Sequence, residues 1–114
     1  METIKLEIPA KVEYVSTVRL TSSSICYQMD FDIESSEDLK VAVSEALNMV
    51  MGEDRVLIAY NKREDGMEII VSLPDRSIVY KTDIGANMGR QILSSLVDEV
   101  EYKEDSIRIF KKKV

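Results

Sequence analysis

The residue types that most often carry out chemistry in proteins are scarce in this chain. It contains no His, which excludes a histidine base, a phosphohistidine and a His-ligated metal. Its single cysteine, Cys26, excludes an intrachain disulfide, a CxxC redox pair and a cysteine-cluster zinc site. Only four glycines are present, which leaves little material for loops that wrap phosphate groups. The sequence therefore predicts no metal centre.

Cys26 itself lies among apolar residues at helical spacing. No Lys or Arg is close to it in the sequence, so nothing nearby would stabilise a thiolate. We interpret Cys26 as a small core residue rather than a reactive thiol.

The charge balance bears on partners and location. Fifteen basic against 21 acidic residues give a net charge of −6, which disfavours binding to nucleic acid. The basic run Lys111–Lys113 is interpreted as a solvated terminus. The first residues alternate apolar and charged types without the apolar stretch of a signal peptide, and no run approaches the roughly 20 apolar residues of a membrane span. We expect a cytoplasmic protein with no membrane partner, and one domain over residues 1–114.

The periodicity of apolar residues predicts which elements position the polar ones. Alternation of apolar and polar residues is typical of half-buried strands, and apolar residues three or four apart are typical of amphipathic helices. Strands are expected over residues 3–8, 55–62, 67–73, 78–81 and 106–111. Helices are expected over residues 11–29, 35–51 and 87–101. Asp65-Gly66 predicts a hairpin between the second and third of these strands, and Ser35-Ser36 predicts the cap of the second helix.

These elements predict an α/β two-layer sandwich. The sheet is expected to be mixed but mostly antiparallel, with four to five strands, and three helices cover one of its faces. The buried stripe of the last helix is expected to contain six apolar residues. They are Met88, Ile92, Leu93, Leu96, Val97 and Val100.

Three stretches of the chain resemble a known family. Residues 37–46, EDLKVAVSEA, are similar to the helix that opens the nucleotide site of anti-sigma factor serine/threonine kinases, in the histidine-kinase-type (GHKL) ATPase superfamily. Residues 8–19 resemble the first strand and first helix of that family. Residues 89–100, which end in LVDEV, resemble the helix after its ATP lid. The resemblance covers nearly the whole chain and implies a histidine-kinase-type ATPase fold.

The same resemblance implies roles for residues of the second helix. Glu45 matches the base that activates the attacking hydroxyl in the family. The family places an Mg²⁺-binding Asn four residues later, where this chain has Met49, while Asn48 stands one position early. A thioether is a poor ligand for a hard cation. The family's downstream His is also missing, with Glu53 near its place.

The other nucleotide motifs of the family are reduced here. An Asp that binds adenine is expected after the strand over residues 67–73, and the stretch there reads Leu73-Pro74-Asp75-Arg76-Ser77. The glycine-flanked loop before the last helix survives only as Asn87-Met88-Gly89, and the lid is shortened to about residues 78–86. The fold is therefore expected to lack an ATP lid. Met49, Met51 and Met88 are interpreted as filling volume that a nucleotide would occupy.

Partner binding is implied by Arg19, which matches an arginine common in the family's first helix. Family members use this helix and the adjoining sheet edge for dimerisation and partner contact, which makes a homodimer possible. A lone helical Arg is otherwise a solvated residue. The acidic residues Glu34, Glu37 and Asp38 would suit a basic partner.

Two functions follow from the resemblance. The first is a regulatory protein-binding module that resembles an anti-sigma factor, binds a sigma factor or an anti-anti-sigma (STAS) protein, and has lost its nucleotide site and hence its cofactor. The alternative is an active ATP-dependent protein serine kinase. In that case Glu45 would be the catalytic base, Asn48 and Gly89 would bind nucleotide and Mg²⁺, and ATP and Mg²⁺ would be the cofactors. A subunit whose partner completes a shared site is a third possibility.

Overall fold

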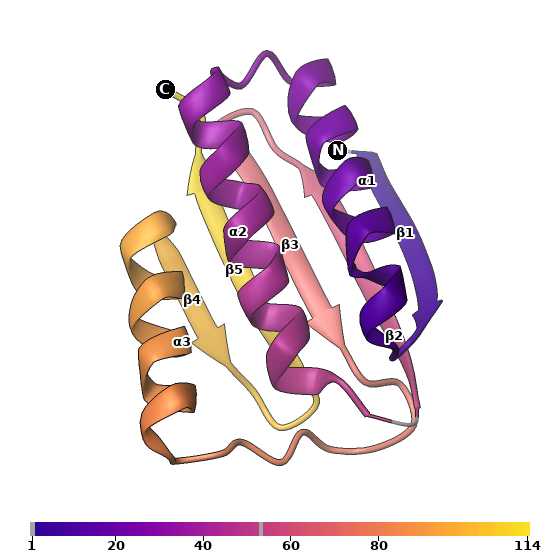
Figure 1. Ribbon diagram of the computed structural model, residues 1–114. Helices are drawn as coiled ribbons and strands as arrows, with labels where there is room; N and C mark the ends of the chain where they lie inside the picture. Colours follow the sequence, from indigo (N-terminus) through magenta and orange to yellow (C-terminus); the bar gives the residue numbers. More distant parts are fainter. Residues whose placement is uncertain (1, 53) are drawn as a thin grey trace.

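The computed structural model describes residues 2–52 and 54–114 and arranges them in two layers (Figure 1). Glu53 lies outside the described residues. Five strands form the sheet: β1 (Glu2–Pro9), β2 (Arg55–Lys62), β3 (Gly66–Ser72), β4 (Glu99–Tyr102) and β5 (Ser106–Lys112). The helices are α1 (Val15–Gln28), which follows a short 3₁₀ turn η1 (Val12–Tyr14), α2 (Ile33–Val50) and α3 (Ile84–Leu96).

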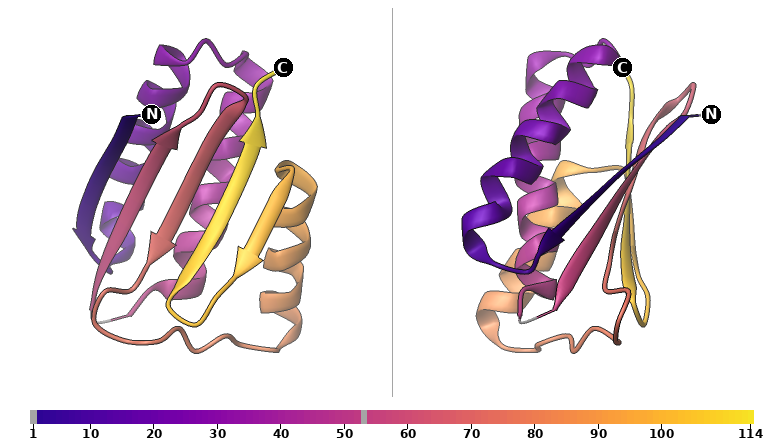
Figure 2. Two further views of the ribbon diagram at one scale, coloured as in Figure 1. Left: turned by 180° about the vertical axis from the view of Figure 1, so that it is seen from behind. Right: turned by 90° about the vertical axis from the view of Figure 1, so that its right-hand side faces the viewer.

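The predicted two-layer α/β sandwich is confirmed. The strand order is β1-β2-β3-β5-β4, and each neighbouring pair is antiparallel, so the sheet is not mixed. All three helices lie on one face of the sheet, and the other face carries no helix (Figure 2). None of the helices in the described ranges is long and apolar enough to cross a membrane.

The core fills the space between the sheet and the helices. Alternate residues of β2 and β3 point toward the helices, as strand periodicity requires. Together with α2 they supply most of the fully buried side chains: Leu39, Val43, Ala46, Leu47, Val56, Ile58, Tyr60, Met67, Ile69 and Val71. Cys26 of α1 is fully buried in the same core, so its prediction as a core residue is confirmed.

One buried polar pair joins the sheet to α1. The Tyr60 hydroxyl lies 2.8 Å from Ser22 Oγ, and Ser22 donates to the Val18 carbonyl at 2.7 Å. Burial raises the pKa of Tyr60 to about 12, because the phenolate would lose its solvation. The pair satisfies both hydroxyls in a region where an unpaired polar group would be costly.

Aspartates begin α2 and α3. Asp32 Oδ1 accepts a hydrogen bond from the Ser35 amide at 2.6 Å, so α2 starts earlier than the predicted serine cap. Asp83 Oδ1 accepts in the same way from the Ala86 amide at 2.8 Å. An aspartate satisfies an amide that has no partner in the first turn of the helix, and its charge suits the positive end of the helix dipole.

Two predictions near the C-terminus were wrong. The expected strand over residues 78–81 is an irregular segment, because β4 occupies the edge of β5 and leaves no neighbour for it. The expected helix over residues 87–101 instead ends at Leu96, and β4 follows. The alternation of Val100 and Tyr102 with Glu99 and Glu101 was the signal for this strand.

The lysines near the C-terminus are also not a solvated tail. Lys111 and Lys112 belong to β5. Lys111 Nζ donates to the Leu96 carbonyl at 2.7 Å and lies 3.5 Å from Asp38 Oδ2. Lys111 therefore ties β5 to the end of α3 and to the first half of α2.

Candidate functional site

A cavity of about 460 Å³ opens between α2, α3 and the segment over residues 73–83. Helix α2 contributes Glu45, Asn48 and Met49 to its wall, and α3 contributes Gly89 and Arg90. Residues three and four apart on a helix share a side, which explains why one helix presents all three α2 side chains. The structure thus brings together the three residues that the family resemblance places around a nucleotide: Glu45, Asn48 and Gly89.

Gly89 is where α3 approaches α2. A Cβ atom at this position would lie 3.1 Å from Glu45 Oε2 and 3.8 Å from Met49 Cε. The absence of a side chain lets the Glu45 carboxylate and the Met49 thioether reach the backbone of α3. The Glu45 carboxylate therefore lies between the two helices and is half-buried.

Of Asn48 and Met49, it is Met49 that lies beside Gly89. It packs against the core, whereas Asn48 is exposed at the rim. Consecutive positions differ by about 100° around a helix axis, so Asn48 cannot occupy the same direction without distortion of the helix. Met49 thus offers only a sulfur atom at this position, and the oxygen atom near Gly89 comes from Glu45. Met51 also lines the cavity, but Met88 does not, so the volume-filling role expected for Met88 was wrong.

Leu73 closes the cavity at the end of β3. Its side chain is buried and lines the wall, and the family resemblance expects an adenine-binding Asp at this position of the sequence. Asp75, the nearest acid in the sequence, lies outside the cavity wall and accepts from Arg55 Nε at 3.0 Å. The Asp75 carboxylate thus forms a surface ion pair between its turn and the start of β2.

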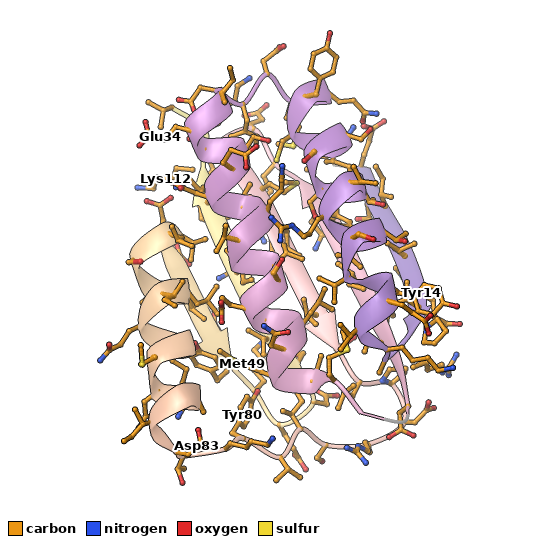
Figure 3. The ribbon with its side chains drawn as sticks, viewed as in Figure 1. Tyr14, Glu34, Met49, Tyr80, Asp83 and Lys112 are labelled. Atoms are coloured by element: carbon orange, nitrogen blue, oxygen red, sulfur yellow. The ribbon has the colours of Figure 1, made fainter. Side chains whose placement is uncertain are left out.

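Asp83 was not singled out from the sequence, yet it stands at the mouth of the cavity. Figure 3 shows Met49, Tyr80 and Asp83 at the same end of the helix layer, between α2 and α3. Because Asp83 accepts from the Ala86 amide, a carboxylate already occupies the first turn of α3. The sequence Thr82-Asp83-Ile84 ahead of an apolar helix was an N-cap signal that could have identified it.

The segment over residues 73–83 is attached to the β4–β5 turn. The Ile78 amide donates to the Glu104 carbonyl at 2.7 Å, and the Ile78 side chain is buried. The Tyr80 hydroxyl donates to the Lys103 carbonyl at 2.6 Å, and the Tyr80 ring meets Tyr102 edge to face at 5.8 Å. Burial raises the pKa of Tyr80, which keeps the hydroxyl a donor. This segment is therefore a fastened connection rather than a long free loop.

Charges of both signs surround the cavity. Arg76, Lys81 and Arg90 are basic, and Glu45 and Asp83 are acidic. Arg76 Nε is held by Asp54 Oδ2 at 3.0 Å. Within residues 2–52 and 54–114 there is no group of three or more His, Cys, Asp or Glu side chains that could hold a metal ion.

Arg19 lies apart from this cavity. It is exposed on α1, and α2 separates α1 from α3 in the helix layer (Figure 1). Any role of Arg19 in partner binding therefore concerns a second surface.

The fold and the cavity agree with the histidine-kinase-type ATPase fold that the family resemblance implies. A sheet is covered on one face by three helices, and a cavity lies between α2, α3 and the segment before α3. The crystal structure of the RsbU and RsbW domains of a Mycobacterium tuberculosis protein matches this fold with a TM-score of 0.78 at 13% sequence identity. The match covers 99% of this chain and 33% of that chain.

Comparisons of sequence identify the family. The serine-protein kinase RsbW of Halalkalibacterium halodurans is 32% identical over 92% of this chain and 78% of its own length. The serine-protein kinase RsbW of Bacillus pumilus is 34% identical over 93% of this chain and 81% of its own length. No family model matches the chain. The chain belongs to the anti-sigma factor serine/threonine kinase family, to which RsbW belongs.

Proposed function

We propose that this protein is a regulatory binding module of the anti-sigma family that has lost its nucleotide site. Its partner would be a sigma factor or a STAS-type antagonist. The module would act by covering the partner's surface and would not phosphorylate it. The composition of the cavity wall is the observation that carries this proposal. Leu73 and Met49 line the cavity, and they occupy the sequence positions at which the family resemblance expects an adenine acceptor and an Mg²⁺ ligand.

Neither residue can replace the missing chemistry. Leucine has no acceptor for the adenine amino group, and leaving that group unpaired in a buried site would cost about 1–3 kcal/mol. Magnesium requires oxygen ligands at short distance, which the Met49 thioether cannot supply. Catalysis of phosphoryl transfer depends almost entirely on correctly placed charges and a metal ion. A site without the adenine contact and the Mg²⁺ ligand would therefore lose most of its rate acceleration.

The start of α3 supports the same conclusion. Helix N-termini bind phosphate through their free amides and the positive end of the dipole. Here the Asp83 carboxylate already accepts the hydrogen bond of the Ala86 amide. Its negative charge would also repel a triphosphate. The fastened segment over residues 73–83 leaves no long loop to close over the phosphates.

Helix α1 supports the protein-binding part of the proposal. It has no acidic residue, although the whole chain carries a net charge of −6. Arg19 is exposed there beside Leu20, and Tyr27 is exposed two turns further along. Arginine and tyrosine are enriched at the residues that dominate protein interfaces.

The test of the nucleotide site is calorimetric titration of the purified protein with ATP and with ADP in the presence of Mg²⁺. We expect no heat of binding and no rise in melting temperature up to about 1 mM nucleotide, because a ligand that binds only the folded state must stabilise it. A positive control is an RsbW kinase, titrated under the same conditions.

Micromolar binding would overturn the proposal in favour of the active kinase. That second function is favoured by one observation, the convergence of Glu45, Asn48 and Gly89 on a single cavity. In that event Glu45→Ala should abolish phosphate transfer to serine while leaving nucleotide affinity nearly unchanged, since a base acts on the hydroxyl and not on ATP.

Arg19→Glu tests the partner surface. We expect it to weaken binding to a sigma factor or STAS protein by more than about 1 kcal/mol, as loss of an interface anchor does. Lys103→Glu, in the β4–β5 turn, makes the same change of charge far from α1 and should leave binding intact. The dissociation constants can be measured by titration calorimetry. An unchanged constant for Arg19→Glu with every candidate partner would remove Arg19 from the interface.

A further inference from the structure

The proposed function leaves the Glu45 carboxylate in the cavity wall without a role. This carboxylate is half-buried between α2 and α3, 3.1 Å from the position that a Cβ atom of Gly89 would take. No hydrogen bond or ion pair joins it to any other residue in the part of the chain that the structure describes. The other half-buried acid of α2, Asp38, lies 3.5 Å from Lys111 Nζ. Of these two acids, Glu45 is therefore the one whose charge has no basic partner among the described residues.

A half-buried charge without a partner is unfavourable, because it has lost part of its hydration. A cation beside the carboxylate would replace the lost hydration, and an ammonium group would do so with hydrogen bonds as well as with charge. An anion in the same place would be repelled by Glu45, and also by Asp83 at the mouth of the cavity. The inner part of the cavity is therefore suited to a positively charged group.

The basic residues of the wall are engaged elsewhere. Arg76 Nε is bound to Asp54 Oδ2 at 3.0 Å, and Asp54 is not part of the wall. Arg90 Nη2 donates to Asn87 Oδ1 at 2.5 Å. With Arg76 paired in this way, the wall retains two bases and two acids, so no excess of positive charge opposes the entry of a cation.

The remainder of the wall is suited to an apolar body. Met49, Met51, Leu73 and Ile78 all line the cavity. Methionine side chains adapt to irregular apolar shapes, because they are unbranched and polarisable. The volume of about 460 Å³ lies within the range of roughly 300–1,000 Å³ that is typical of small-molecule sites. The size and lining of the cavity thus fit a small organic molecule.

We propose that this cavity binds a small organic cation, an amine carried on an apolar body. The ammonium group lies against the Glu45 carboxylate, and the apolar body lies against Met49, Met51 and Leu73. The inference deepens the proposed function and rests on it, because a nucleotide bound between α2 and α3 would occupy the same space.

Three compounds with the same aromatic ring and different charges test the class of ligand. Benzylamine is a cation at neutral pH, benzyl alcohol is neutral and benzoate is an anion. Each is titrated into the isotope-labelled protein and followed by nuclear magnetic resonance. Benzylamine should bind at least about ten-fold more tightly than the other two, with a dissociation constant near ~1 mM for a ligand of this size. The amide signals of Met49, Leu73 and Gly89 should shift most.

Glu45→Gln removes the charge of the side chain and keeps its shape. We expect this change to weaken benzylamine binding at least about ten-fold and to leave the weaker binding of benzyl alcohol unchanged. Glu34→Gln is the matched control, because it makes the same change in α2 at the end of the helix opposite Met49, and both affinities should persist (Figure 3). Met49→Ala removes apolar contact and should weaken both compounds to the same extent. Circular dichroism verifies that the variants fold.

Equal affinity for the three compounds, or benzylamine binding that survives Glu45→Gln, would overturn the inference. The absence of any amide shift at about 10 mM benzylamine would do the same. The ATP titration separates this inference from the proposed function. A failed benzylamine titration without nucleotide binding removes the inference alone, whereas nucleotide binding removes both.

Discussion

Gly66 shows how a single residue can be required by its neighbours rather than by its own backbone. Asp65-Gly66 predicted a hairpin, and the β2–β3 hairpin is confirmed. No glycine among the described residues has a positive φ, so a left-handed turn is not the reason for Gly66. A Cβ there would lie 2.2 Å from the Lys111 carbonyl oxygen and 2.9 Å from Lys112 Cα, both backbone atoms of β5. Gly66 is what lets β5 pair along the full length of β3.

Gly66→Ala should therefore destabilise the protein by about 2–3 kcal/mol, because backbone atoms of a central ladder must move. Gly85→Ala is the matched control. Its Cβ would come no closer than 3.5 Å to Asp83 Oδ1, and alanine favours a helix, so stability should be equal or higher. Urea unfolding of both variants measures the two free energies. Equal stability of Gly66→Ala and wild type would show that β5 can shift at little cost.

At the level of residues, sequence alone could name the cavity wall but not its geometry. Glu45, Asn48 and Gly89 were found through the family motifs, and they do share one cavity. Which of Asn48 and Met49 faces α3 depends on the rotation of α2, which is set by packing of the whole helix. Asp83 was missed because the predicted start of α3 was placed too late.

At the level of elements, strand β3 depends on a buried charge. Glu68 points to the open face of the sheet, where it accepts from Asn61 Nδ2 and Arg63 Nη2, both at 2.8 Å, and pairs with Arg108. Arg108 in turn reaches Glu99 and Glu101 of β4. Burial alone would raise the pKa of Glu68, but the hydrogen bonds from Asn61 and Arg108 and the charges of Arg108 and Arg63 hold it below the ordinary value of 4.5. This network joins four strands on the uncovered face.

The network predicts a specific sensitivity to acid. Folding lowers the pKa of the Glu68 carboxyl group, so its charge stabilises the folded protein at any pH above the pKa of the unfolded state. That stability is lost as the pH falls below about 4.5 and the folded-state carboxylate takes up a proton. Glu68→Gln should be less stable at neutral pH by about 1–3 kcal/mol, because charged hydrogen bonds are lost. The difference from wild type should shrink as the pH is lowered through this range.

Denaturant unfolding at a series of pH values measures the effect, with Glu64→Gln in the exposed hairpin loop as the control. Curves for Glu68→Gln and wild type that run parallel down to low pH would contradict the assignment.

The boundary between α3 and β4 shows where element prediction fails. Val97 and Val100 fit a helical stripe as well as a strand, so periodicity could not separate the two. The tertiary structure decides, because the free edge of β5 accepts Glu99–Tyr102 and thereby excludes residues 78–81. Strong local signals, such as the alternation in β2 and the apolar face of α2, were sufficient for most of the remaining fold.

At the level of the whole molecule, the fold could be predicted from the sequence better than the binding surfaces could. Alternating strands and amphipathic helices require one face of a sheet to be covered, which leaves few arrangements. Strand order could not be predicted. Met88 and Ile92 of α3 were predicted to be buried but are 56% and 39% exposed, and Gly89 and Leu93 are buried instead. Both outcomes depend on which surfaces remain after the core is filled. Helix α1, which carries Arg19, and the cavity beside α3 lie on opposite sides of α2 (Figure 1).

The fastened segment over residues 73–83 has a consequence for how such a protein would signal in a cell. An enzyme that opens and closes over its substrate can inactivate many partner molecules in turn, so a few copies suffice. With Tyr80 holding this segment to the β4–β5 turn, and the proposed function correct, each copy neutralises one partner for as long as the complex lasts. The amount of free partner would then depend on the ratio of partner to this protein, with a threshold set by the number of copies synthesised. The partner would be released by competition or by degradation of the protein.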